Sequence, residues 1–236
     1  MAISRRSALR TSLLSSTGLL LAGGGITAAS ASAAPVMAPA LATDPDTALT
    51  LLREGNRRWR TYHQVHPNED AERRAEAVDG QSPFALVLGC ADSRVAPELV
   101  FDRGVGDLFD TRSAGQVLDE SVLGSIAYGV EHLHIPLIVV LGHAACGAVT
   151  AAVEAHRSGD VPAGHIGYLV QQLLPVVEAT PDSGDDFIDD CISANALDIA
   201  DTLRSDPELA GHVDSGELRV VAARYELDGS TVTFLD

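Results

Sequence analysis

Two uninterrupted apolar runs constrain the fold of this chain more than any other feature. Phe84–Leu88 and Leu137–Leu141 contain no polar side chain, which is typical of strands buried on both faces of a parallel sheet. Between them, apolar residues recur at helical spacing from Val122 to Leu133. The order strand, helix, strand predicts an α/β fold with a mostly parallel central sheet flanked by helices.

Both ends of the domain add elements to this sheet. Leu49–Tyr62 predicts an amphipathic helix, which would form an N-terminal helical arm. Leu218–Tyr225 and Thr231–Leu235 are β-rich runs separated by Asp228-Gly229, so they predict a C-terminal β-hairpin. The other expected elements are a short strand at Asp107–Arg112, a helix with Ser121 as its N-cap, and helices at Cys146–His156, Ile166–Glu178 and Phe187–Leu203.

Metal-binding side chains follow both buried runs. Cys90 comes just after the first run, and His143 and Cys146 come just after the second. The carboxyl ends of parallel strands meet at one edge of a sheet, so these three side chains are expected to meet there. Two thiols and an imidazole suit Zn²⁺, and three protein ligands leave a fourth position open for catalysis. We therefore predict one zinc ion per chain, with Asp92 and Arg94 as a catalytic pair beside it.

The N-terminal segment has the features of an export signal. Arg5-Arg6 is a twin-arginine pattern, an apolar stretch rich in Gly, Ala and Ser follows, and Ala31-Ser32-Ala33 resembles a cleavage site. We predict a signal peptide over residues 1–33, a flexible linker over 34–46 and one domain over 47–236. The exported protein would be periplasmic, cell-wall-associated or extracellular. The apolar stretch is short, so stable membrane insertion after cleavage is not expected.

Charge and cysteine content exclude several other classes of protein. The formal charge of −17 argues against binding to nucleic acid or to anionic lipid surfaces. Of the three cysteines, Cys191 lies in an apolar helical pattern and predicts a buried, inert thiol. A Cys90–Cys146 disulfide in an oxidised, metal-free form is an alternative. A thiol redox protein is disfavoured because the chain has no C-x-x-C motif.

The motifs Cys90-x-Asp92-x-Arg94 and His143-x-x-Cys146-Gly147 together resemble those of the β-class carbonic anhydrases. The resemblance extends over about residues 47–236. It also includes Gly55-Asn56-Arg57, Gly106-Asp107-Leu108-Phe109, Arg112-Ser113-Ala114-Gly115, Tyr128 and the last two strands.

The resemblance implies reversible hydration of CO₂ to bicarbonate and a proton by a zinc-bound hydroxide. Cys90, His143 and Cys146 would hold the zinc. Asp92, paired with Arg94, would orient the hydroxide, or would swing onto the zinc and close the site. The residues that match the substrate-binding groups of plant-type members are Gln81, Phe109 and Tyr128. Gly147 is expected to join them in the substrate site by allowing close approach of the backbone around the metal.

The resemblance also bears on regulation and assembly. Some bacterial members have a tryptophan where this chain has Val87, so the inhibitory bicarbonate switch of those members is predicted to be absent. Family members form dimers, with the active site at the interface and the N-terminal helix wrapped around the partner, so a homodimer or homotetramer is expected. Two alternatives stay open: a carbonyl sulfide or carbon disulfide hydrolase on the same fold, and a non-catalytic zinc protein with Asp92 as fourth ligand.

Overall fold

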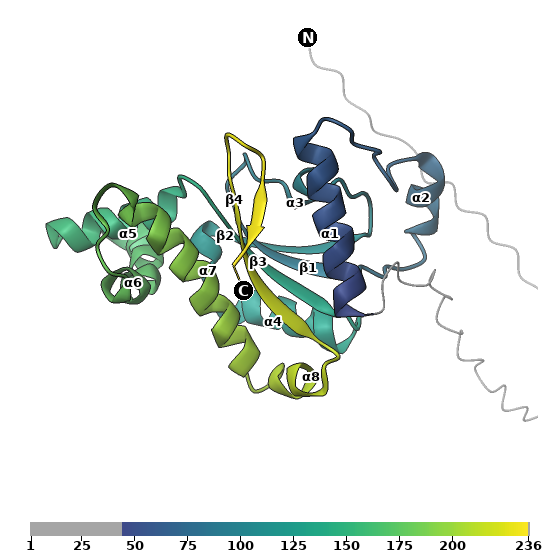
Figure 1. Ribbon diagram of the computed structural model, residues 1–236. Helices are drawn as coiled ribbons and strands as arrows, with labels where there is room; N and C mark the ends of the chain where they lie inside the picture. Colours follow the sequence, from purple (N-terminus) through teal and green to yellow (C-terminus); the bar gives the residue numbers. More distant parts are fainter. Residues whose placement is uncertain (1–43, 236) are drawn as a thin grey trace, which may run out of the picture. The chain divides into compact units, whose positions relative to one another are not determined.

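The computed structural model describes residues 44–235, and its centre is a five-stranded sheet (Figure 1). The strand order is β2-β1-β3-β4-β5, in which β1, β2, β3 and β4 are parallel and β5 runs antiparallel to β4. This confirms the predicted mostly parallel sheet. The strands are β1 (Ala85–Cys90), β2 (Leu108–Ser113), β3 (Leu137–His143), β4 (Arg219–Tyr225) and β5 (Val232–Phe234).

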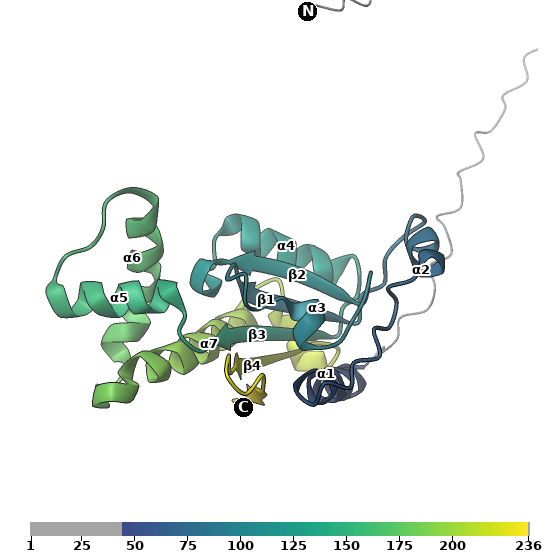
Figure 2. The ribbon, with the colours of Figure 1, turned by 90° about the horizontal axis from the view of Figure 1, so that it is seen from above.

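Helices cover both faces of the sheet, as Figure 2 shows for α4 and α1 on opposite sides. Successive side chains of a strand point to opposite faces, so Ala85 and Val87 join one apolar cluster, while Leu86 and Leu88 join another. This is why the run has no polar residue. The first face carries α1 (Pro45–Arg60) and α3 (Pro97–Val100); the second carries α4 (Glu120–Glu131), α7 (Phe187–Ser205) and α8 (Ala210–Ser215).

A third apolar cluster lies past the carboxyl ends of β1 and β3. It is formed mainly by α5 (Gly147–Ser158), α6 (Gly164–Ala179) and the first half of α7, and Figure 1 shows α5 and α6 standing to one side of the sheet. Cys90 and Cys146 belong to this cluster, so the predicted metal site has an apolar wall. The remaining short elements are α2 (Ala71–Glu76), η1 (Ala114–Gln116) and η2 (Gly184–Asp186).

The first helix differs from its prediction in extent. It begins at Pro45 rather than Leu49 because the Asp44 carboxylate caps it, accepting a hydrogen bond from the Thr47 backbone N–H at 2.9 Å. The last two residues of the predicted linker over 34–46, Pro45 and Asp46, belong to α1, and residues 34–43 lie outside the described part of the chain. The apolar side chains of α1 lie against the chain's own sheet, so only its outer face is free to contact a partner.

The start of α4 corrects a second prediction. The N-cap is Asp119, not Ser121, because the Asp119 carboxylate accepts hydrogen bonds from the backbone N–H groups of Ser121 and Val122, both at 2.9 Å. The predicted signal peptide over 1–33 lies outside the described residues. Within residues 44–235, no helix has both the length and the apolar composition needed to cross a membrane.

An acidic side chain in β2 makes stability depend on pH. Burial, together with the neighbouring Glu98 carboxylate, raises the pKa of Asp110 to about 7. One Asp110 carboxylate oxygen is buried without a hydrogen-bond partner among the described residues. The pKa in the folded state lies above the unfolded value near 3.8, so the stability associated with this group is greatest at low pH and is lost as the pH rises to about 7.

Asp110→Asn is therefore expected to gain stability relative to the unchanged chain as the pH rises from 5 to 7.5. The gain should grow by about 2–3 kcal/mol, because over this range the unfolded chain ionises Asp110 and the folded chain resists it, whereas the amide cannot ionise. Urea unfolding at several pH values measures it. Asp79→Asn, at an exposed carboxylate, is the matched control and should show no such trend. An Asp110→Asn curve parallel to that of the unchanged chain would contradict the prediction.

Candidate active site

The structure brings the three predicted metal ligands together. Cys90 is the last residue of β1, His143 is the last residue of β3, and Cys146 immediately precedes α5. Since β1 and β3 are paired and parallel, their ends lie side by side. The potential ligand atoms of all three residues lie within 4.8 Å of one another. The side chains are buried, with exposures of 5% for Cys90, 0% for His143 and 1% for Cys146.

These donors fit a zinc ion. The His143 Nδ1 lies 2.9 Å from the Ala144 carbonyl oxygen, and since a carbonyl only accepts, Nδ1 carries the proton and Nε2 has a free lone pair. Nε2 is buried without a hydrogen-bond partner among the described residues, which is costly unless something binds it. The two sulfurs lie 4.0 Å apart, close to the separation of about 3.8 Å that two Zn–S bonds of about 2.3 Å give at a tetrahedral ion.

The two thiols influence each other's ionisation. A hydrogen bond from the Cys146 thiol lowers the pKa of Cys90 to about 4, against the opposing effect of burial. The pKa of Cys146 is raised, because its thiol proton is held by Cys90 and because it is buried. The free site therefore favours one thiolate and one thiol. Binding a metal through both sulfurs requires the loss of the proton that they share.

Asp92 and Arg94 lie on the solvent-exposed side of the three potential ligands. The Asp92 carboxylate accepts two parallel hydrogen bonds from the Arg94 guanidinium, at 2.9 and 2.7 Å, and a third from the Arg94 backbone N–H at 2.9 Å. The guanidinium holds the pKa of Asp92 down at about 2. An Asp92 oxygen lies 3.9 Å from His143 Nε2, so an ionised acceptor stands next to the ligand atoms.

Two further residues contribute to the site, although their side-chain chemistry alone did not predict a role there. The Arg112 guanidinium donates hydrogen bonds to the carbonyl oxygens of Cys90, Asp92 and Val95, at 2.9, 2.7 and 2.9 Å, and so fixes the loop that carries Asp92. The Gly115 backbone N–H points at Cys90 Sγ at 3.4 Å. The only sequence signal for either was the family motif Arg112–Gly115.

The predicted substrate-binding residues do not all join this group within one chain. Phe109 and Tyr128 lie together, with ring centroids 6.2 Å apart, but Phe109 pairs with Leu86, four residues before Cys90 in β1. That offset corresponds to about 13 Å along the strand. Gln81 is exposed and precedes β1, at the end opposite Cys90. Gly147 opens α5 next to Cys146, and a Cβ there would meet no atom within 4 Å.

Comparisons with known proteins agree with this geometry. The carbonic anhydrase family model matches residues 85–232. Carbonic anhydrase 2 of Mycobacterium tuberculosis is 38% identical over 195 residues, which are 82% of this chain and 94% of that protein.

Solved structures give the same result for the fold. The Coccomyxa β-carbonic anhydrase in complex with acetazolamide matches with a TM-score of 0.65 and 27% identity, covering 79% of this chain and 86% of that one. A tetrameric β-carbonic anhydrase from Sordaria macrospora matches with a TM-score of 0.63 and 23% identity, covering 77% and 93%. The chain belongs to the β-class carbonic anhydrase family.

Proposed function

We propose that this protein catalyses the zinc-dependent, reversible hydration of CO₂ to bicarbonate and a proton. The observation that carries the proposal is the buried Cys90, His143 and Cys146 group next to an Asp92–Arg94 pair. When bound there, zinc would supply Lewis-acid chemistry that makes water nucleophilic near neutral pH. Membership of the carbonic anhydrase family supports CO₂ as the substrate.

The protein's own residues have separate tasks in this reaction. His143 presents Nε2 to the metal because Nδ1 is engaged with the Ala144 carbonyl. Asp92 stays ionised and accepts a hydrogen bond from the attacking water, which orients a lone pair toward CO₂. Arg94 holds that carboxylate in place through its two bonds to Asp92 and a further bond to the Ala145 carbonyl at 3.1 Å. Because Arg94 holds Asp92, this carboxylate would not serve as a fourth ligand to a metal held by the three other residues, which supports an enzyme over a non-catalytic zinc protein.

The substrate is tested by comparing three related molecules. The zinc-loaded chain should hydrate CO₂ much faster than it hydrolyses carbonyl sulfide or carbon disulfide under the same conditions. Acetazolamide, which is bound in the Coccomyxa relative, should inhibit the reaction. A higher kcat/KM for either sulfur compound would replace the proposed reaction with the alternative hydrolase.

We propose further that a second copy of the chain completes the pocket. The end of β1 and β2 opposite Cys90 carries Gln81, Phe109 and Tyr128. The side chain of Tyr128 is 46% exposed although it is large and apolar. The strand β2 forms one edge of the sheet, next to this exposed group. A partner could therefore bring its own copies of these residues to the metal site. The tetrameric Sordaria relative supports an oligomer.

Mixing two inactive chains tests this arrangement. Cys90→Ser removes a metal ligand, and Gln81→Ala together with Tyr128→Ala removes pocket groups. In each mixed dimer, one of the two sites would combine an intact metal group with intact pocket residues from the other chain. Random pairing makes half of the dimers mixed, so activity should return to about a quarter of the unchanged level. No recovery after refolding the two together would place the whole pocket in one chain.

We propose that the protein is exported by the twin-arginine route, on the basis of Arg5-Arg6 and the apolar stretch that follows. Replacing both arginines with lysine should keep the protein in the cytoplasm, where its N-terminus would remain uncleaved in mass spectra. Normal export of that variant would reject the route.

A further inference from the structure

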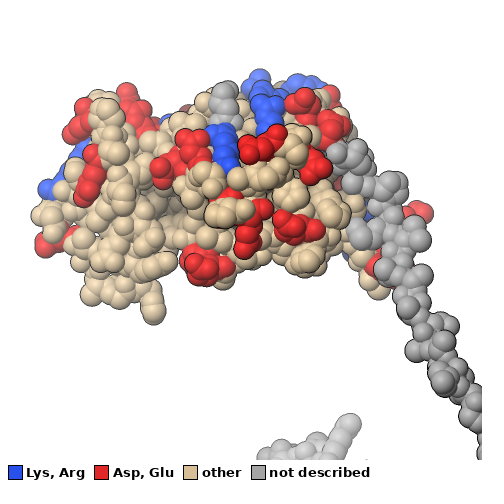
Figure 3. Space-filling view, turned by 90° about the horizontal axis from the view of Figure 1, so that it is seen from below, with Lys and Arg blue, Asp and Glu red and all other residues tan. Residues whose placement is uncertain are grey.

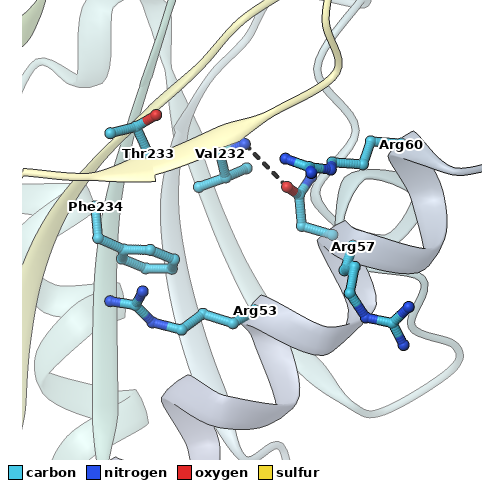
Figure 4. Close-up of a pocket in the computed structure, with 7 residues that line it drawn as sticks. Arg53, Arg57, Arg60, Val232, Thr233 and Phe234 are labelled. Atoms are coloured by element: carbon cyan, nitrogen blue, oxygen red, sulfur yellow. Dashed lines mark hydrogen bonds between the residues drawn. The ribbon is translucent and has the colours of Figure 1, made fainter.

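A second concave site lies away from the metal group, between α1 and the edge strand β5. Figure 4 shows this cavity of about 430 Å³. Its wall on α1 carries Arg53, Arg57 and Arg60, and its other wall is the short strand β5 with Phe234. In the figure, Arg60 reaches back toward Val232, Arg53 lies next to the Phe234 ring, and Arg57 is turned outward at the rim. None of the proposed catalytic residues lines it.

The charge of this cavity contrasts with the rest of the molecule. The chain carries 33 acidic residues against 16 basic ones, yet none of the acidic residues that the structure describes lines this cavity. Within residues 44–235, no ion pair is formed by Arg53, Arg57 or Arg60. Arg58, which lies on the same helix but outside the cavity, pairs with Asp102. On the face drawn in Figure 3, acidic side chains are widely spread, and the few basic ones lie mainly along one margin.

The two walls of the cavity are held at a fixed separation. Asn56, which is buried, donates hydrogen bonds to the Val100 and Ser230 carbonyl oxygens at 3.1 and 3.0 Å. Its own carbonyl oxygen accepts one from the Val232 backbone N–H at 2.9 Å. This one side chain therefore ties α1 to the β4–β5 hairpin. The site exists before a ligand arrives, which reduces the entropy cost of binding.

The arginines themselves are spaced for more than one anionic group. Arg53 and Arg60 are seven residues apart, or about 10 Å along the helix axis, and lie on the same face. The Arg53 guanidinium is 4.3 Å from the centroid of the Phe234 ring, which restricts its position. Guanidinium groups bind phosphate and carboxylate oxygens through paired, charge-assisted hydrogen bonds.

From these observations we infer a binding site for a compact polyanion, a small molecule with at least two phosphate or carboxylate groups, between α1 and β5. Arg53 and Arg60 bind its separate charged groups, and Arg57 contributes at the rim. A singly charged anion such as bicarbonate spans only one of these positions and binds weakly. The site is distinct from the metal group in both residues and chemistry.

The test is calorimetric titration of the zinc-loaded protein at constant ionic strength with two probes. Tripolyphosphate represents phosphate ligands. Benzene-1,3,5-tricarboxylate represents carboxylate ligands, and its carboxylates point too far apart to chelate the zinc. We expect at least one probe to bind saturably with one molecule per chain, and the tighter probe identifies the chemical class. Arg53→Gln or Arg60→Gln should weaken binding about threefold to fivefold, and the double variant about tenfold or more.

Arg74→Gln is the matched control, because Arg74 is exposed on α2 and lies outside the cavity. It should leave probe affinity unchanged, and all these variants should keep the CO₂ hydration rate of the unchanged chain. If the double variant fails to fold, Arg60→Gln alone gives the answer, since its side chain makes no hydrogen bond within residues 44–235. Absence of saturable binding by both probes would overturn the inference, and so would equal weakening by Arg74→Gln.

Discussion

Asp92→Asn is expected to keep one zinc per chain and to lower kcat/KM for CO₂ about a hundredfold or more. An ionised Asp92 offers only acceptor oxygens to the attacking water. The asparagine amide also presents N–H groups, which cannot accept that hydrogen bond, and it carries no charge to attract Arg94. The geometry makes the effect specific, because this carboxylate lies 3.9 Å from His143 Nε2 and is held by Arg94. Stopped-flow CO₂ hydration and zinc analysis of the same sample measure both quantities.

A matched control separates this role from the loss of any aspartate–arginine pair. Asp201 also pairs with an arginine, Arg204, at 2.6 Å on the surface of α7, so Asp201→Asn should leave kcat/KM unchanged. Full turnover by Asp92→Asn, with zinc bound, would remove Asp92 from the mechanism.

Cys146→Ser is expected to have the second large effect, the loss of both zinc and activity. A serine hydroxyl stays protonated at neutral pH and is a poor zinc ligand, so the affinity of the remaining two-ligand site should fall by about a hundredfold or more. The melting temperature in the presence of zinc should fall as well, because bound metal stabilises the folded chain. Cys191→Ala is the control, since Cys191 is buried in α7 and outside the metal group. Stoichiometric zinc in Cys146→Ser would contradict the assignment.

Much of this site could be predicted because its signals are local. A strand buried on both faces must be apolar throughout, so β1 and β3 stand out in the sequence, and parallel strands deliver their carboxyl ends to one edge. Cys90 and His143 follow those strands directly. Their proximity therefore needed no knowledge of the loops, and the structure places their ligand atoms together.

The features that were missed depend on contacts between distant segments. The role of Arg112 rests on three carbonyl oxygens that only the folded loop brings within reach. The raised pKa of Asp110 depends in part on Glu98 of the neighbouring α3, which the pattern of β2 does not show. Phe109 and Tyr128 matched a family pocket, but a family match does not say whether a residue serves its own chain or a partner. The start of α1 was predicted too late because Asp44 caps the helix ahead of its apolar pattern, and the N-cap of α4 was misplaced because Asp119 and Ser121 are both residues that favour helix caps.

The central claim is that Cys90, His143 and Cys146 hold one zinc ion that gives the chain its carbonic anhydrase activity. The most direct test is to remove all metal from the full chain, add back zinc in steps, and record stopped-flow CO₂ hydration at each step with a pH indicator. We predict that activity rises in proportion to bound zinc and stops rising at one ion per chain. Activity in the metal-free chain, or one bound zinc per chain without turnover, would contradict it.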